Sequence, residues 1–350
     1  MMNILIVYPY FIATGGVEKH ITELSEHLTS FGHNVIILAC RIDSTLISVY
    51  PPEGMETPIS ESELERIGKS LLVRTKLPKY YRLFRISKGS YLNLLVVAYE
   101  LSKAIIKVVK KYKIDRIYAC EAAAIIASYF AYRRIKKYSP NLKLIASLHT
   151  SFAIKHKPVH EAMRHILTPF HKVVVTNINQ NTYNRFRKDY ENRLIFISNW
   201  VNDRRFRKRY NCKQKIRRRF GIPEDRIVFL CVTRLVPAKN PLNVLRAFHL
   251  LKERMGRNDL MLVIVGEGNL RPIIGKYIQM FNLHNYVRLL EPIPHFKDEY
   301  PLLYNVADVF AFTPFHEGVS MVVLEALASG LPVIYSDVSG IPKNLLDAIT

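Results

Sequence analysis

The amino-acid sequence predicts an α/β protein with two doubly wound parallel-sheet domains. The chain has 350 residues, whereas a single hydrophobic core usually stops growing at about 250 to 300 residues. It opens with an apolar run, a glycine pair and a helical period, and after Ser198 a similar alternation begins again. Strands that alternate with helices form parallel sheets with helical crossovers. We therefore expect one domain over residues 1–200 and another over residues 201–350.

The first half begins with a strand at residues 3–9 and a Thr-Gly-Gly loop, followed by a helix whose apolar residues are spaced by three and four. The amphipathic segments between the later strands are long enough to be crossover helices. The stretch that follows residue 39 is expected to be irregular and basic. Further strands are expected at residues 34–39, 116–119, 143–148, 172–176 and 193–197.

The second half repeats the alternation of strands and helices. Strands are expected at residues 227–232, 260–265, 286–289, 309–312 and 332–335, and helices at residues 241–255, 269–281 and 319–329. The strands are short apolar runs and the helices have apolar residues on one face. This pattern favours a second Rossmann-like sheet.

Cysteine usage and hydropathy limit the class of protein. The four cysteines are far apart and lack the spacing of zinc ligands or of a disulfide framework, which fits a reducing compartment. The apolar run at residues 4–8 is too short for a signal sequence, and no 18 consecutive apolar residues occur. We therefore expect a cytoplasmic protein that can be peripheral on the inner face of a membrane.

A net charge of +22 predicts attraction to an anionic partner. Residues 66–88 hold eight basic and no acidic side chains, mixed with Leu, Tyr and Phe, and residues 204–219 hold ten basic ones. Basic and apolar side chains together suit an anionic membrane surface, so we expect residues 66–88 to face one. A solvated helix face or loop is the alternative for both segments, and it fits the second better.

The most specific motif is EGVSMVVLEALASGLPVI at residues 317–334, in which two glutamates stand eight positions apart. It resembles the E-x7-E motif of the group 1 glycosyltransferases, family 4, whose fold is called GT-B. Other stretches resemble segments of the same family, in the same order. They are TGGVEKHITELSEHL (14–28), SLHT (147–150), ISNWVNDRRF (197–206), VTRLVPAKN (232–240) and VGEGNLR (265–271). The resemblance covers nearly the whole chain and implies two Rossmann-like domains facing a cleft, the first binding the acceptor and the second a nucleotide sugar.

The two glutamates suit an elongated ligand. Eight residues of helix rise about 12 Å, so Glu317 in the loop before the predicted helix and Glu325 within it can reach opposite ends of one molecule. The resemblance implies that Glu317 faces the donor sugar and Glu325 hydrogen-bonds the ribose hydroxyls. Gly318, Val319 and Ser320 begin the same helix and are expected to line the nucleotide site, because backbone amides at a helix N-terminus bind phosphate. Glu325 stands among apolar residues, and a buried carboxylate needs partners; an exposed helix residue is the alternative.

Arg234 and Lys239 follow a predicted strand and resemble the phosphate site of the family. Negative charge grows on the diphosphate leaving group as the glycosidic bond breaks, so fixed cations lower the barrier. Arg can hold two oxygens at once and Lys supplies a point charge. We expect both residues to take part in donor binding and catalysis; in so basic a chain, a chance pair is the alternative.

Glycines and one histidine complete the predicted site. Gly15 and Gly16 let the backbone approach a ligand, although a simple turn is the alternative. Gly266 and Glu267 follow another strand and are expected to shape the nucleotide pocket, without the GxGxxG spacing of a dinucleotide site. His149 ends an apolar strand at the carboxyl edge of the sheet, where ligand groups usually lie. The resemblance places it beside the reacting sugar, where it orients donor or acceptor; a structural histidine is the alternative.

The predicted chemistry needs no cofactor besides the UDP- or GDP-linked donor. The sequence contains no Asp-x-Asp motif, which disfavours a metal-dependent transferase. The family is retaining, and no second carboxylate is obviously placed to form a covalent intermediate. The resemblance therefore implies a front-face displacement in which the departing phosphate accepts the proton of the acceptor hydroxyl. A polysaccharide or a lipid-linked glycan is the expected acceptor.

Departures from the family leave alternatives open. Glu291 stands where the family often has glycine and Lys343 where it commonly has glutamate, so the base is not predicted. The chain ends at Thr350, where relatives continue, so we expect the second domain to be incomplete. One rival is an inactive GT-B-like protein that binds anionic surfaces or nucleic acid with strong salt dependence. Another is a different GT-B enzyme, such as an epimerase or a phosphorylase.

Overall fold

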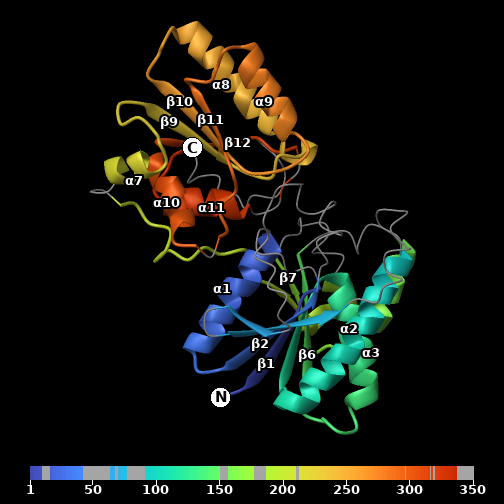
Figure 1. Ribbon diagram of the computed structural model, residues 1–350. Helices are drawn as coiled ribbons and strands as arrows, with labels where there is room; N and C mark the ends of the chain where they lie inside the picture. Colours follow the sequence, from blue (N-terminus) through green and yellow to red (C-terminus); the bar gives the residue numbers. More distant parts are fainter. Residues whose placement is uncertain are drawn as a thin grey trace. The chain divides into compact units, whose positions relative to one another are not determined.

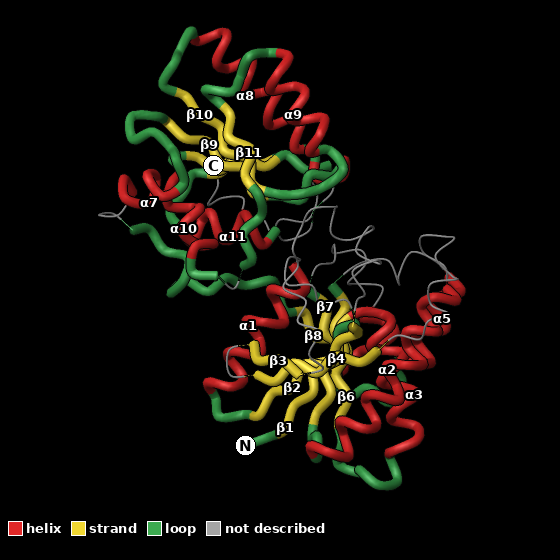
Figure 2. Tube along the Cα trace, viewed as in Figure 1, coloured by secondary structure: helices red, strands yellow, loops and turns green. Residues whose placement is uncertain are grey.

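The chain folds into two compact units, each a sheet between helices (Figures 1 and 2). The computed structural model describes residues 1–9, 16–41, 64–67, 70–76, 91–149, 157–176, 187–209, 213–295, 297–315, 317 and 320–336. The first unit ends at Ser198 and the second begins at Asn199.

The first unit contains an eight-stranded sheet in the order β3-β4-β2-β1-β5-β6-β7-β8. All neighbouring pairs run parallel except β3 with β4. Its strands are β1 (Asn3–Val7), β2 (Asn34–Arg41), β3 (Leu64–Ile67), β4 (Ser70–Lys76), β5 (Arg116–Cys120), β6 (Lys143–Leu148), β7 (Lys172–Val175) and β8 (Leu194–Phe196). Its helices are α1 (Gly16–Ser30), α2 (Tyr91–Tyr112), α3 (Glu121–Ile135) and α5 (Lys157–Ile166).

Alternate residues of each strand enter the two cores of this unit, because successive side chains of a strand point to opposite faces. Leu5 and Val7 of β1 join the cluster formed with α2 and α3. Ile4 and Ile6 join the cluster that contains Ile21 of α1. Figure 1 shows the same division, with α1 on one face of the sheet and α2 and α3 on the other. The predicted doubly wound architecture is thus confirmed.

Part of the stretch predicted to be irregular is a β-hairpin at the sheet edge. Strands β3 and β4 pair antiparallel, and β4 continues the sheet parallel to β2. Leu72 is fully buried and Arg74 is 9% exposed, so burial of apolar side chains outweighs the basic composition. The prediction that the stretch is irregular is wrong for this part. Residues 70–76 also cannot all face a membrane, and residues 77–88 of that prediction lie outside the described part of the chain.

The second unit contains a five-stranded parallel sheet in the order β11-β10-β9-β12-β13. Its strands are β9 (Ile227–Val232), β10 (Leu260–Val265), β11 (Val287–Leu290), β12 (Val309–Phe312) and β13 (Val333–Tyr335). Its helices are α7 (Lys213–Arg219), α8 (Pro241–Met255), α9 (Arg271–Met280), α10 (Glu299–Val306) and α11 (Met321–Ala328). The predicted strands and helices of this half are confirmed to within two residues at each end.

Helix α8 has identifiable start and stop signals. Pro241 occupies its first turn, where the missing N–H is not needed, and Gly256 caps its end with φ +59°. Helices α8 and α9 cover one face of the sheet, and α10 and α11 cover the other (Figure 1). The interior strand β10 is buried along its whole length, as expected for a parallel sheet covered on both faces.

One arginine of the basic segment at residues 204–219 is structural, whereas the other basic side chains in this segment are exposed or partly exposed, as the solvated alternative predicts. The guanidinium of Arg217 is buried and donates to the carbonyl oxygens of Val306, Glu224 and Arg226 at 2.7–2.9 Å and to Asp308 Oδ2 at 2.7 Å. Burial alone would raise the pKa of Asp308, but the Lys213 hydrogen bond and the attraction of both cations hold that pKa below its usual value. These residues join α7 to the sheet.

We expect the Arg217→Met variant to lose about 3 kcal/mol of the free energy of unfolding, because the change leaves three carbonyl oxygens without this donor and takes the buried cation away from Asp308, which keeps only Lys213 and the Val228 N–H among the described donors. Arg218→Met is the matched control, since Arg218 is 72% exposed and pairs with Glu224 at the surface; its effect should stay below about 1 kcal/mol. Urea denaturation measures both. Equal losses in the two variants would contradict the structural role of Arg217.

Candidate functional site

In the second unit, the predicted site residues lie where the winding of the sheet reverses. Strand β9 lies between β10 and β12. The chain runs outward from β9 through β10 to β11 on one side, and then from β12 to β13 on the other side, so the winding reverses between β9 and β12. Loops that leave the carboxyl ends of two such strands diverge and open a crevice, which is where α/β proteins bind ligands. Arg234 and Lys239 follow β9, and Glu317 follows β12. The structure therefore places these three residues in loops at the same edge of the sheet, after the two strands between which the winding reverses.

Lys239 and Glu317 form an ion pair that joins the loop after β9 to the loop after β12. Their side chains are 18% and 15% exposed, so the pair is largely shielded from water, yet open to a ligand. Two further contacts join the same loops: Phe315 N donates to Ala238 O at 3.1 Å, and Asn243 Nδ2 donates to Thr313 Oγ1 at 3.2 Å. The distance between the two charged groups is thus set by backbone and side-chain contacts on both sides. Arg234, in the loop after β9, is exposed.

The glycine loop after β10 packs directly on the loop that carries Arg234. A Cβ atom at Gly266 would lie 1.8 Å from the Thr233 carbonyl oxygen, and one at Gly268 would lie 2.3 Å from that of Leu235. Leu235 N donates to Glu267 O at 2.8 Å. Only residues without a side chain allow this approach, so the glycines hold the cationic loop in place rather than leaving open space.

Arg271 was not among the predicted site residues, but it fixes the glycine loop. Its guanidinium donates to Gly266 O at 2.8 Å, approaches Glu267 Oε2 at 3.4 Å and pairs with Glu291 Oε1 at 2.6 Å. The spacing of four between Glu267 and Arg271 on a forming helix is a signal that sequence reasoning could have used. Glu291, which stands where the family often has glycine, therefore pairs with the same arginine that holds the glycine loop.

Glu325 is fully buried in α11, so the alternative of an exposed helix residue is wrong. Its Oε2 atom accepts hydrogen bonds from the hydroxyls of Tyr300, at 2.9 Å, and Tyr304. Burial, followed by the influence of Tyr300, raises the pKa of Tyr304 well above its usual value, so this hydroxyl stays a donor. Both tyrosines lie four apart on α10, and sequence reasoning missed them. A contact between Glu325 and ribose stays a prediction.

The glycine and loop residues at the two predicted helix starts are only partly described. Gly15, Gly318 and Val319 lie outside the described residues. Gly16 begins α1, and a Cβ atom there would meet nothing within 4 Å. Ser320 is buried at the start of α11, and its carbonyl oxygen accepts from Leu324 N at 3.1 Å.

In the first unit, His149 follows β6 and belongs to a chain of hydrogen bonds. Its Nε2 atom lies 3.0 Å from Ser147 Oγ, and its Nδ1 atom lies 3.0 Å from Thr176 Oγ1. Ser147 Oγ accepts from the Tyr118 hydroxyl at 2.8 Å, and that hydroxyl lies 3.2 Å from His20 Nε2. The rings of His20 and His149 are in edge contact, with centroids 4.4 Å apart. Sequence reasoning missed His20, although it lies four residues after Gly16.

The Tyr118 hydroxyl donates to Ser147 Oγ, so the hydroxyl proton of Ser147 is available to His149 Nε2. The hydrogen bonds to Ser147 and Thr176 together set which ring nitrogen of His149 carries the proton. Burial lowers the pKa of His149 to about 4; burial and then the charge of His149 lower that of His20 to about 2. Both rings are therefore neutral near pH 7, and both nitrogens of His149 have protein partners.

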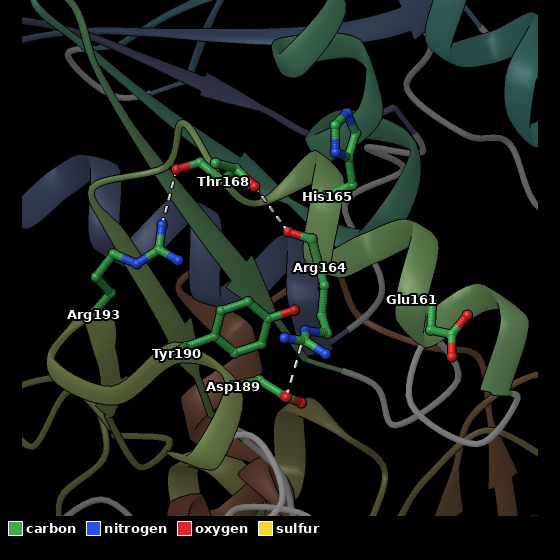
Figure 3. Close-up of a pocket in the computed structure, with 7 residues that line it drawn as sticks. All are labelled: Glu161, Arg164, His165, Thr168, Asp189, Tyr190 and Arg193. Carbon is green, nitrogen blue, oxygen red and sulfur yellow. Dashed lines mark hydrogen bonds and ion pairs between the residues drawn. The ribbon is translucent and has the colours of Figure 1, made fainter.

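A separate hollow of about 350 Å³ lies away from these residues (Figure 3). Thr168 and Arg193 precede β7 and β8, so it is at the amino edge of the sheet, opposite His149. Arg164 pairs with Asp189 across it at 3.5 Å, and Arg193 donates to the Thr168 carbonyl oxygen at 2.9 Å. Its polar groups are thus largely engaged with one another, and it contains none of the predicted site residues.

Two features bear on possible membranes and metals. Among the described helices, none combines the length and the apolar character needed to cross a bilayer. In the same part of the chain, no three potential metal ligands of the Asp, Glu, His or Cys type lie together.

Two family models match the sequence. The model described as Glycosyltransferase Family 4 matches residues 14–205, and the model described as Glycosyl transferases group 1 matches residues 213–350. Sucrose-phosphate synthase from Thermosynechococcus elongatus has a similar solved structure, with a TM-score of 0.71 at 17% identity over 97% of this chain and 82% of that one. This similarity shows the predicted GT-B fold.

Curated relatives are similar over different lengths. GDP-mannose-dependent alpha-(1-6)-phosphatidylinositol monomannoside mannosyltransferase of Mycolicibacterium smegmatis is 31% identical over 187 residues, which make up 51% of this chain and 47% of that protein. Alpha-monoglucosyldiacylglycerol synthase of Acholeplasma laidlawii is 23% identical over 339 residues, or 94% of this chain and 79% of that protein. The chain thus spans about half the length of the first relative.

The two buried histidines predict a loss of stability in acid. An unfolded histidine titrates near 6.5, whereas His149 titrates at about 4 and His20 at about 2 in the folded protein. Between pH 6.5 and 4 the unfolded chain binds more protons, so the free energy of unfolding falls as the pH falls through this window and is constant with respect to these groups above it. Each histidine contributes a slope of at most about 1.4 kcal/mol per pH unit.

The His149→Gln variant should therefore lose less stability than the wild type between pH 7 and pH 4.5, because glutamine takes up no proton. The quantity to compare is the difference between the urea midpoints at the two pH values, which does not depend on the variant's stability at pH 7. Identical differences in both proteins would contradict a buried neutral His149.

Proposed function

The chain belongs to the group 1 glycosyltransferases, family 4, and from this premise we propose that it transfers a glycosyl group from a nucleoside diphosphate sugar to a hydroxyl acceptor. The second unit binds the donor, and the first binds the acceptor. The observation that carries the proposal is the Lys239–Glu317 ion pair between the loops that follow β9 and β12, at the point where the sheet winding reverses. Two groups of opposite charge are held there, within reach of one ligand.

The charges of this site suit a diphosphate leaving group. Lys239 is already held by the loop contacts around it, so its ammonium needs little reorganisation when a phosphate oxygen replaces the carboxylate of Glu317 as its partner. The released carboxylate is then free to accept hydrogen bonds from sugar hydroxyls, which is the role that the resemblance gives to Glu317. Arg234 adds a second, exposed cation. Fixed cations of this kind stabilise the departing phosphate without a metal ion, and we propose a metal-independent reaction.

The stereochemical course that we propose is retention. The acceptor oxygen forms its bond to the anomeric carbon on the face from which the phosphate oxygen departs, the carbon–oxygen bond to phosphate breaks, and the departing phosphate takes the acceptor proton. His149 does not act as a base in this scheme, because both of its ring nitrogens are engaged by Ser147 and Thr176. Its part is to hold the shape of the edge on which the acceptor rests. The anomeric configuration of the product, read by NMR, distinguishes retention from inversion.

Donor binding is the test of this function. Calorimetric titration of UDP, GDP and ADP into the wild type should give selective binding of one nucleotide. Lys239→Met should weaken it about 10- to 100-fold, since a hydrogen bond to a charged group contributes about 1.5–3 kcal/mol. Lys276→Met, at an exposed position of α9, is the matched control and should bind like the wild type.

Salt dependence separates this function from its rival. A site for one nucleotide keeps its selectivity between low and physiological salt, whereas a general polyanion binder loses most of its affinity as salt rises. Weak binding of all three nucleotides with equal loss in both variants would contradict a donor site and favour the inactive anionic-surface or nucleic-acid binder.

For the acceptor, we propose a lipid-linked or glycolipid hydroxyl at an anionic membrane surface. The names of two relatives contain phosphatidylinositol monomannoside and monoglucosyldiacylglycerol, which are membrane lipids. The three described cysteines are buried and free, which fits a cytoplasmic protein at the inner face of a membrane. The donor that we propose is a UDP-linked or a GDP-linked sugar.

The described surface that best supports this attachment is one face of α2. Leu95 and Tyr99 are 48% and 46% exposed, and they are followed at helical spacing by exposed lysines. The lysines are Lys103, Lys107, Lys110 and Lys111. Residues three and four apart share a helix face, so the apolar and the basic side chains lie in one stripe, as on helices that rest in a lipid interface.

Vesicle binding tests the stripe on α2. Replacing Lys107, Lys110 and Lys111 together by glutamine should lower partition to vesicles of phosphatidylglycerol roughly a hundredfold at low salt, since each lysine near an anionic surface contributes about 1 kcal/mol. The matched control replaces three exposed cations of the second unit, Arg246, Arg254 and Lys276. An equal effect of both triple variants would mean that net charge, and not this face, drives attachment.

A further inference from the structure

Tyr335 is the last residue of β13, and it is held against the loop that carries Glu317. Strand β13 pairs parallel with β12, and in this register Tyr335 stands opposite Phe312. The rings of these two residues pack with their centroids 5.9 Å apart. The next residue, Ser336, donates from Oγ to the Pro314 carbonyl oxygen at 2.8 Å. These contacts fix the carboxyl end of β13 beside the loop that runs from β12 to Glu317.

The side chain of Tyr335 points to the sheet face that α11 covers. Tyr335 and Val333 lie two apart on the strand, and both pack with the apolar cluster that contains Val323 of α11. Ile334, between them, points to the other face and is 51% exposed. Glu317 lies in the loop that leads into α11, and its charge acts on the Tyr335 hydroxyl. The hydroxyl and the carboxylate are therefore near one another.

The hydroxyl of Tyr335 is a buried donor. Its oxygen atom is shielded from water, and among the residues that the structure describes it has no hydrogen-bond partner. Burial, followed by the charge of Glu317, raises the pKa of Tyr335 above its usual value, so the hydroxyl keeps its proton. A buried donor without a partner destabilises the folded state, and native structures contain few such groups. A partner in another state of the site would account for this hydroxyl.

The proposed function requires Glu317 to change its partner when the donor binds. In the free protein its carboxylate is paired with Lys239. A diphosphate that draws the ammonium of Lys239 to its own oxygens leaves this carboxylate without its cation, at a position where the side chain is only 15% exposed. A shielded carboxylate needs partners, and hydrogen bonds to an ionised acceptor are strong. The hydroxyl of Tyr335 is close by, and within the described part of the chain it has no hydrogen bond to give up.

We propose that Tyr335 is a positioning residue of the donor site, whose hydroxyl donates a hydrogen bond to the carboxylate of Glu317 once a diphosphate has taken Lys239. This inference rests on the proposed function. The new bond compensates Glu317 for the loss of its cation and leaves the other carboxylate oxygen for the hydroxyls of the donor sugar. Tyr335 acts through Glu317, and no covalent bond is made or broken at it. The carboxylate thus has a partner both before and after the donor binds.

Tyr335→Phe removes only the hydroxyl, and it should affect stability and binding in opposite directions. The urea midpoint of the free protein should equal that of the wild type or be higher, because a buried donor without a partner is removed. The affinity for the nucleotide that the wild type selects among UDP, GDP and ADP should fall about tenfold, because the complex loses a hydrogen bond to a charged group.

Tyr286→Phe is the matched control in the same unit. The Tyr286 hydroxyl donates to Asn258 Oδ1 at 2.8 Å, and Tyr286 precedes β11, so this contact lies at the amino edge of the sheet, away from Glu317. The control should lower the urea midpoint slightly and leave the nucleotide affinity within twofold of the wild type. It shows what the loss of a purely structural tyrosine hydroxyl does in this sheet.

A double-mutant cycle with Glu317 separates positioning from a general effect of the ring. In a Glu317→Ala background, Tyr335→Phe should change the nucleotide affinity less than twofold, because the carboxylate that receives the bond is absent. An equal loss in both backgrounds overturns the proposal, and so does an unchanged affinity in the single variant. A lower midpoint of Tyr335→Phe also overturns it, because the hydroxyl would then have a partner in the free protein. Failure of the wild type to bind any of the three nucleotides instead rejects the proposed function, and the inference on Tyr335 falls with it.

Discussion

Reversal of strand winding is the constraint on which both candidate sites depend. In each unit the strands run parallel, apart from β3, so their carboxyl ends meet at one edge, and the loops that follow two adjacent strands diverge only where the winding changes direction. In the second unit this pair is β9 and β12, and in the first it is β1 and β5. The residues that chemistry singles out, Lys239 with Glu317 in the second unit and His149 in the first, follow strands at or next to these pairs. Apolar packing on both sheet faces fixes the positions of the strand ends. The positions of the loops that follow these strands are fixed in turn.

The positive charge of the chain has two different uses. Arg217 and Lys213 lie in the most basic segment, but they are directed inward, to carbonyl oxygens and to Asp308. Their charge contributes to the stability of the fold and adds little to the electrostatic potential at the surface. The lysines of α2, in contrast, have exposed side chains on one face of a long helix. Net charge alone could not separate these two groups, because the distinction is made by which side chains the packing buries.

Sequence reasoning found the architecture because hydrophobic periodicity survives in each strand and helix. It placed Arg234, Lys239, Glu317 and His149 correctly at strand ends, since that inference needs only the order of elements. It failed for β3 and β4, where basic residues hide a short apolar alternation around Leu72. It also missed the partners of the site residues. Tyr300, Tyr304 and Arg271 are distant in sequence from at least one group that they bind, and no local pattern specifies such pairs.

The strained backbone conformation of Glu121 could not be predicted from the sequence either. Nothing in the letters around Glu121 predicts a positive φ, because the conformation is imposed by the direct passage from β5 into α3. The two carboxylates at the two reversals are consequently held in opposite ways. Glu317 is paired with an ammonium, so its charge is masked until an anion takes Lys239 from it. Glu121 Oε1 accepts a hydrogen bond from the backbone N–H of His149 at 3.1 Å. One architecture thus holds a carboxylate at each reversal, and the two have different kinds of partner, an ammonium in the second unit and a backbone N–H in the first.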